Sequence, residues 1–178
     1  MEMKKIVANA CAAFVLGLPL AAYGQLPCGA ATPADSEGPF YKAGAPARAS
    51  LIEAGGKGER LVLAGRVLGA DCKPVAGVTL DFWQTDEKGE YDNERFRYRG
   101  KVTTDGEGRY RVETVLPAEY PGRPRHIHVK LQRAGGRVLT TQLYFPGESR
   151  NQNAALVVKM ERGEGGRLAV YDFVLGGT

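Results

Sequence analysis

The sequence predicts an all-β fold, a β-sandwich of about seven to eight strands in a single domain. Three observations support this fold class. Short apolar runs alternate with turn clusters from Arg60 to the end of the chain. No apolar pattern of helical period and useful length competes with them. The 178 residues are enough for one domain with a substantial core and are short for two.

The first segment, residues 1–24, is expected to be a secretory signal that is cleaved from the mature protein. Lys4 and Lys5 form a basic start, an apolar stretch follows from about residue 6 to 22, and small residues stand at Ala22 and Gly24. The alternative, a single membrane anchor, is disfavoured because the run is short for a spanning helix. The sequence therefore predicts a periplasmic or secreted protein with no membrane contact after cleavage.

Residues 25–59 form a lead rich in Pro, Gly and Ala that lacks a sustained apolar period, so we expect it to be extended or irregular and to lie across the domain surface. Cys28 lies in this lead. Because Cys11 belongs to the signal, Cys28 and Cys72 remain as an even pair, and an exported protein favours a disulfide between them. Lipidation of Cys28 is a weaker alternative, since residues 25–27 lack the small side chains of a bacterial lipobox.

The sandwich itself is expected to occupy residues 60–178, with strands in the apolar runs. In VTLDFWQT, period two places Val78, Leu80 and Phe82 on one face. RVLTTQLYF alternates in the same way, and the Asp105-Gly106 pair indicates a turn before the next strand. The main predicted strands are LVLAGRVLG, VTLDFWQT, RYRVETV, HIHVKL, RVLTTQLYF and LAVYDFVL.

The charge balance argues against a nucleic-acid partner. The formal net charge is +4, and removing Lys4, Lys5 and Glu2 with the signal leaves a mild +3. Basic and acidic residues are interspersed, except for one dense run at RFRYRGK, residues 95–101. We interpret that run as a solvated loop unless it borders a pocket for an anionic substrate.

The segment HIHVKL carries the chemistry that the sequence suggests first. If it is a strand, His126 and His128 share one face, roughly 7 Å apart along the strand, while Ile127, Val129 and Leu131 supply the core face. Two imidazoles so placed can bind one first-row metal ion. His-x-His also occurs on ordinary solvent-facing strands, so this segment alone leaves both interpretations open.

Two tyrosines extend the candidate metal site. Tyr120 lies in a loop that returns to the histidines through Pro121, Gly122 and Pro124, and Tyr91 lies in the turn-like KGEYDNE. Two phenolates with two neutral imidazoles suit ferric iron better than zinc or copper(I). Each tyrosine by itself is more typical of a core or surface aromatic than of a metal ligand. A structural zinc or copper site is disfavoured because tyrosine ligands are uncommon there.

Several motifs together resemble the intradiol ring-cleavage dioxygenases, the family of the protocatechuate 3,4-dioxygenase β subunit and the catechol 1,2-dioxygenases. The matching segments are EGPFY, LDFWQTDEKGEYD, TTDGEGRYRVETVLPAEYP, RPRHIHVKL and TTQLYFPGE. The resemblance implies an Fe(3+) cofactor bound by Tyr91, Tyr120, His126 and His128. It further implies that Arg123 and Gln142 assist catalysis, and that Tyr120 is the ligand which an incoming catechol displaces.

The resemblance also implies the reaction and the partners: a small catechol-type substrate and O2, converted to a cis,cis-muconate-type diacid. The chain lacks the helical N-terminal segment of the catechol 1,2-dioxygenases, and two site loops look shorter than in the protocatechuate enzymes, so the substrate stays open. The resemblance is also compatible with a homo-oligomer. The alternative function is a non-catalytic exported β-sandwich module that binds phenolics, carbohydrate or protein.

Overall fold

The computed structural model describes residues 29–148, 153–163 and 165–176. The predicted signal at 1–24 and Cys28 lie outside these ranges, so the signal and the Cys28–Cys72 bridge stay predictions. Within the described ranges, no helix is long and apolar enough to cross a membrane.

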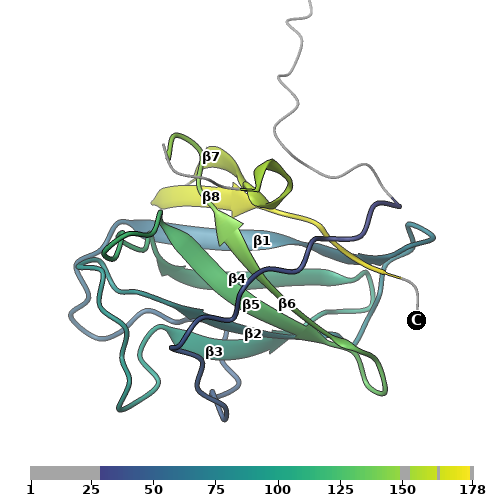
Figure 1. The fold of residues 1–178 in the computed structure, drawn as a ribbon, viewed down its shortest axis with the longest axis horizontal. Helices are drawn as coiled ribbons and strands as arrows, with labels where there is room; N and C mark the ends of the chain where they lie inside the picture. Colours follow the sequence, from purple (N-terminus) through teal and green to yellow (C-terminus); the bar gives the residue numbers. More distant parts are fainter. Residues whose placement is uncertain (1–28, 149–152, 164, 177–178) are drawn as a thin grey trace, which may run out of the picture.

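Two sheets stack to form a β-sandwich (Figure 1). One sheet has four antiparallel strands in the order β3-β2-β5-β6. The other has the order β4-β1-β8-β7, with β9 also beside β1. The strands are β1 (Arg60–Gly69), β2 (Thr79–Gln84), β3 (Arg99–Thr103), β4 (Arg109–Val115), β5 (His126–Gln132), β6 (Val138–Tyr144), β7 (Lys159–Gly163), β8 (Gly166–Val170) and β9 (Phe173–Leu175), with a short 3-10 helix η1 (Ala154–Leu156) before β7.

The predicted all-β sandwich is confirmed, with nine strands in the described residues. Three of these strands go beyond the six named runs: β3 and β7 form in segments that were not named, and the run LAVYDFVL is divided between β8 and β9. Both halves pair in parallel with β1, β8 against Leu61 to Ala64 and β9 against Val67 to Gly69. Tyr171 and Asp172 lie at the break between them.

The core lies between the two sheets and follows the predicted alternation. Leu80 and Phe82 of β2 are fully buried there, and so are Val129 and Leu131 of β5. Leu61, Leu63 and Val67 of β1 face them from the other sheet. Because this face of β5 is held in the core, period two directs His126 and His128 to the opposite face.

Residues 29–59 of the N-terminal lead form no helix or extended strand and pack against both sheets (Figure 1). The backbone N–H of Asp35 donates to the carbonyl of Thr140 at 3.0 Å, which fixes the lead against β6. Further along, Lys101 of β3 donates to Pro46 at 2.9 Å, and Leu51 donates to Glu113 of β4 at 2.7 Å. The lead therefore covers the outer face of the four-stranded sheet, where the two histidines point.

Candidate metal centre

Three donor atoms converge beside the start of β5. The Nε2 atoms of His126 and His128 lie 3.1 Å apart, and the Tyr91 hydroxyl lies 3.2 Å from the first and 3.1 Å from the second. Both histidines are only 3% exposed. Ligands about 2.1 Å from one metal ion and at right angles to one another would be about 3.0 Å apart, so this triangle fits a shared first-row metal ion.

The hydrogen bonding of His126 sets which nitrogen faces the centre. Its Nδ1 lies 2.6 Å from the Pro124 carbonyl, which can only accept, so Nδ1 carries the proton and Nε2 presents a lone pair. Burial lowers the pKa of His126. Burial, with His126 and Arg123 nearby, lowers the pKa of His128 to about 2. Both imidazoles are therefore neutral at neutral pH, which is the form that binds metals.

Tyr91 reaches the centre from the loop after β2. Burial raises the pKa of its hydroxyl, and the neighbouring Tyr120 raises it further, whereas Arg123 and Arg99 oppose the shift. A phenolate at this position therefore needs a nearby cation of substantial charge, such as a bound metal ion. The ring of Tyr91 is stacked on Phe40 of the lead, with 4.3 Å between centroids.

Tyr120 joins the same cluster through its ring. The ring centroid lies 5.7 Å from that of Tyr91 and 6.0 Å from that of His126. Tyr120 begins a tight turn that is closed by a 2.9 Å hydrogen bond from the Arg123 N–H to the Tyr120 carbonyl. Among the described hydrogen bonds, none joins the Tyr120 hydroxyl to the other three residues. The structure thus brings all four predicted ligands together, with three donor atoms in direct contact.

Hydrogen bonds join the loop that carries Tyr91 to the loop that carries Tyr120. The Thr85 hydroxyl donates to the Ala118 carbonyl at 2.8 Å, and the Ala118 N–H donates to Asp86 at 3.0 Å. Gly89 lies where the loops touch: its φ is +87°, and a Cβ there would lie 2.2 Å from the Glu119 carbonyl oxygen. A side chain at this position would push the loops apart, so the approach of Tyr91 to Tyr120 depends on this glycine.

The structure also brings Arg123 and Gln142 together beside these residues. Arg123 Nη2 donates to Gln142 Oε1 at 2.7 Å. Gln142 is opposite His128 in the β5–β6 register, and its Nε2 donates to the Ser36 carbonyl at 2.6 Å and hydroxyl at 2.8 Å. Tyr144 also donates to Gln142 Oε1, at 3.0 Å. The fully buried amide therefore fixes the guanidinium of Arg123 between β6 and the lead.

Sequence reasoning missed several residues that surround the ligands. Trp83 stacks on His128 with 4.7 Å between centroids and 6° between planes, and Tyr41 packs on Trp83 at 4.9 Å. The backbone of Gly38 lies against His128, since a Cβ there would be 3.4 Å from its Cε1. The segment EGPFY was the available signal, because Gly38, Phe40 and Tyr41 all belong to it.

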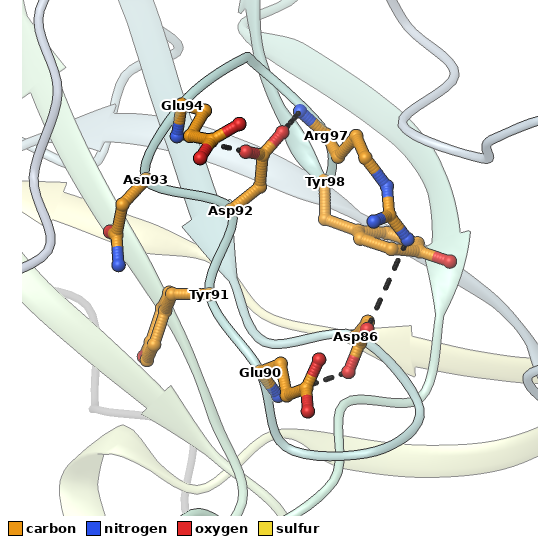
Figure 2. A pocket seen from close by; sticks show the side chains of 8 residues that line it. All are labelled: Asp86, Glu90, Tyr91, Asp92, Asn93, Glu94, Arg97 and Tyr98. Carbon is orange, nitrogen blue, oxygen red and sulfur yellow. Dashed lines mark hydrogen bonds and ion pairs between the residues drawn. The ribbon is translucent and has the colours of Figure 1, made fainter.

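The arginine-rich run at 95–101 differs from the solvated loop that the sequence suggested. Its last part enters β3, and Arg99 is only 1% exposed. Arg97 lines a cavity of about 300 Å³ together with Asp86, Glu90, Tyr91, Asp92, Asn93, Glu94 and Tyr98 (Figure 2). This cavity is acidic, and Tyr91 points away from Arg97 and Tyr98 in it (Figure 2). The run therefore does not form a pocket for an anionic substrate.

The donor set favours a tyrosine–histidine metal centre over other kinds. No group of three or more His, Cys, Asp and Glu side chains is placed to hold a metal within the described residues. The two histidines therefore need oxygen donors from tyrosine, and hard phenolate oxygens with imidazoles suit a trivalent iron. The fold and the site thus define a class, that of β-sandwich proteins with a candidate tyrosine–histidine metal centre on one sheet.

The chain belongs to the intradiol dioxygenase family. The family model described as Dioxygenase matches residues 36–176. Catechol 1,2-dioxygenase 2 of Acinetobacter lwoffii is 34% identical over 143 residues, covering 66% of this chain and 52% of the relative. The protocatechuate 3,4-dioxygenase beta chain of Burkholderia cepacia is 39% identical over 110 residues, covering 51% and 46% respectively. The chain thus spans about half the length of these curated relatives.

A solved structure agrees over a larger share of the fold. It is the dioxygenase domain of a dioxygenase carbohydrate-binding protein fusion from Streptomyces sp. SirexAA-E. That domain is 45% identical to this chain, with a TM-score of 0.81, and the match covers 84% of this chain and 100% of the domain. The whole of that domain therefore has a counterpart here.

Proposed function

We propose that this protein cleaves the ring of a catechol-type substrate between its two hydroxylated carbons, using O2 and Fe(3+), and releases a muconate-type diacid. The observation that carries the proposal is the convergence of the Tyr91 hydroxyl with the Nε2 atoms of His126 and His128. Similar proteins are named catechol 1,2-dioxygenase and protocatechuate 3,4-dioxygenase beta chain. A non-catalytic binding module would not need this donor set together with Arg123 and Gln142.

In the proposed mechanism, Tyr91, Tyr120, His126 and His128 would hold the iron. When bound, ferric iron would supply Lewis acidity toward the oxygens of the substrate. Tyr120 lies on a turn and contacts the cluster through its ring, so its hydroxyl is the one of the four donors that could turn toward a substrate hydroxyl. As a phenolate, its Oη would accept one proton from a catechol hydroxyl.

Arg123 would act on the charge that develops in the substrate ring. Its guanidinium donates to Gln142, and its charge lowers the pKa of both His128 and Tyr91. A fixed cation at that point stabilises negative charge as it forms and needs no reorganisation to do so. Phe40, Trp83 and the lead backbone exclude water from one side of the centre.

The test is reconstitution of the purified protein with ferric iron, followed by visible spectroscopy and oxygen uptake with catechol, protocatechuate, hydroxyquinol and caffeate. We expect a strong tyrosinate-to-iron absorption that shifts when substrate is added. Tyr91→Phe and His128→Ala should lose the absorption and the activity, whereas Tyr98→Phe, a tyrosine of the same loop outside the cluster, should keep both. A wild-type protein that stays colourless after reconstitution would contradict the proposal.

We also propose that the mature protein is exported to the periplasm or secreted, and that it acts as a homo-oligomer or alone without a second kind of subunit. The basic and apolar start of the sequence supports export. Mass spectrometry of the mature N-terminus after expression in a host with a secretion pathway tests this directly. A soluble product that retains Met1 would contradict export.

A further inference from the structure

Arg99 is a buried cation next to the proposed metal centre. It is the first residue of β3, lies opposite Trp83 in the β2–β3 register, and is only 1% exposed. No carboxylate of the described residues forms an ion pair with it, although other arginines of the same part of the chain are so paired. Burial lowers the pKa of Arg99, as expected for a guanidinium held away from water.

All of its side-chain hydrogen bonds go to two backbone carbonyls. Nε and Nη2 donate to the carbonyl oxygen of Asp92 at 3.1 and 2.9 Å, and Nη1 donates to that of Phe40 at 2.7 Å. The planar guanidinium thus joins the lead to the loop that follows β2. A lysine ammonium is a single point of charge and cannot reproduce this fork.

The two carbonyls belong to the segments that carry the stacked pair at the centre. Phe40 is itself one ring of the stack, and Asp92 directly follows Tyr91, the other ring. Tyr91 is the only one of the three contacting donors that comes from a loop, since His126 and His128 are fixed by β5. Its hydroxyl therefore depends on contacts such as these for its place near the imidazoles.

We propose that Arg99 is a positioning residue, which clamps the Phe40 segment to the Tyr91–Asp92 loop and so sets the Tyr91 hydroxyl for metal binding. The inference rests on the proposed function for the role of the metal. The clamp itself concerns only residues of this chain. A residue that orients a ligand in this way typically changes metal affinity by about 10–100-fold when it is replaced.

The test compares Arg99→Lys and Arg99→Met with wild type. Arg99→Met removes the guanidinium and its charge, whereas Arg99→Lys keeps the charge. If Arg99→Met does not fold, Arg99→Lys still tests the proposal in a folded protein. Arg48→Met is the matched control, because Arg48 also joins the lead to the start of β3, through the carbonyls of Arg99 and Phe96, but contacts neither Phe40 nor Asp92.

The first readout is hydrogen–deuterium exchange of the metal-free proteins. In both Arg99 variants, peptides spanning 36–42 and 86–94 should exchange faster together, by at least about threefold, while the control leaves both unchanged. The second readout is the rate of ferric iron loss to a chelator, followed by the visible absorption. We expect about 10-fold or faster loss and a shifted absorption in Arg99→Lys, with wild-type behaviour in Arg48→Met.

Unchanged exchange in the two peptides would overturn the clamp. Faster exchange with iron retention and absorption equal to wild type would overturn the positioning role and leave Arg99 a purely structural residue. If wild type itself bound iron without a visible absorption, the proposed function would fail, while the exchange comparison would still decide whether Arg99 holds the two segments together.

Discussion

Phe40 lies flat on Tyr91, with 4.3 Å between ring centroids and 17° between ring planes. The two residues are far apart in the sequence, and the contact makes the lead part of the metal centre. Stacked aromatic pairs contribute about 0.5–1.5 kcal/mol beyond the area they bury. Because Tyr91 is held by a loop, the loss of this stack should affect its position more than the overall fold.

Phe40→Leu is therefore expected to weaken iron binding with only a small loss of stability. It keeps an apolar side chain and removes the stack, so ferric iron should be lost to a chelator several times faster than from wild type. Phe96→Leu serves as the control, because Phe96 contacts Lys42 and lies outside the ligand cluster. Equal iron loss from the two variants would show that the stack does not position Tyr91.

Gly89→Ala should separate the two tyrosine loops. The backbone φ of +87° strains any residue other than glycine, and the new Cβ would meet the Glu119 carbonyl oxygen at 2.2 Å. Gly135→Ala is the control that measures the backbone strain without a steric clash, since Gly135 has a φ of +71° with open space around it. Strain alone costs about 1–2 kcal/mol, so thermal unfolding should show this loss in Gly135→Ala and a clearly larger one in Gly89→Ala.

The two glycine variants should also differ at the metal centre. Gly89→Ala should lose iron binding in the protein that remains folded, because Tyr91 and Tyr120 move apart, while Gly135→Ala keeps it. If both variants lost the same stability and both bound iron, the close approach of the loops would not matter for the site.

Gln142→Leu should slow turnover without removing the metal. The substitution takes away the acceptor of Arg123 and the donor to Ser36, whereas the Tyr144 hydroxyl keeps Asp35 as an acceptor. Buried groups left without a partner in this way cost about 1–3 kcal/mol. We expect kcat to fall by about tenfold or more while the visible absorption of the iron centre stays close to wild type, because Gln142 is not a ligand.

Thr141→Val is the matched control for Gln142→Leu. Thr141 directly precedes Gln142 in β6, is fully buried, and donates to the Pro33 carbonyl at 2.8 Å, so it also anchors the lead, whereas Arg123 donates to Gln142. A comparable fall of kcat in Thr141→Val would attribute the effect to the lead and would contradict a role for Gln142 through Arg123.

Residues on regular strands could be predicted from the sequence because period two ties sequence position to one face of a sheet. Period two therefore predicts that His126 and His128 lie on the face opposite a core that includes Leu80, Phe82 and Val129, and the structure places them there. Tyr91 and Tyr120 are candidates from the sequence, but loops have no period from which the direction of their side chains could be inferred. Arg123 and Gln142 enter only through the resemblance to a family.

The remaining parts of the site depend on contacts between irregular segments distant in the sequence. Phe40 and Arg99 meet Tyr91 and Asp92 only once the lead is folded across β3. In the sequence, Arg99 looks like the charged residues around it. Its burial and its hydrogen bonds to two backbone carbonyls depend on the folded structure, so no local sequence signal distinguishes it from its neighbours. The division of the last apolar run into β8 and β9 likewise follows from pairing with β1 and not from local propensity.

The predicted Cys28–Cys72 bridge has support from the position of the residue after Cys28. A Cβ on Gly29 would lie 3.9 Å from the carbonyl oxygen of Ala70, so Gly29 lies beside the turn that carries Cys72. We expect peptide mapping of the exported protein without reductant to yield a linked pair. Cys72→Ser should lower stability by about 2–4 kcal/mol, and a reductant should reproduce the loss in wild type but not in the variant. Unlinked peptides from the exported protein would contradict the bridge.

Alkaline pH should destabilise the sandwich through two buried tyrosines outside the metal centre. Tyr110 donates to the Tyr171 carbonyl at 2.8 Å, and Tyr171 donates to the Ala155 carbonyl at 2.7 Å. Burial raises the pKa of Tyr171 to about 12 and that of Tyr110 well above its usual value. In the unfolded chain both hydroxyls titrate near about 10.

Above that pH the unfolded chain releases protons that the native protein retains, so the free energy of unfolding falls as pH rises. The stabilisation from both tyrosines is complete below about pH 10 and is lost progressively as pH rises toward the native pKa values. Thermal unfolding of the metal-free protein should therefore show a Tm that is nearly constant from pH 8 to 9.5 and then decreases. Tyr171→Phe removes one of the two groups and should have a lower Tm at pH 8 but a shallower decrease above pH 10. An equally steep decrease in the variant would mean that Tyr171 does not contribute to the alkaline transition.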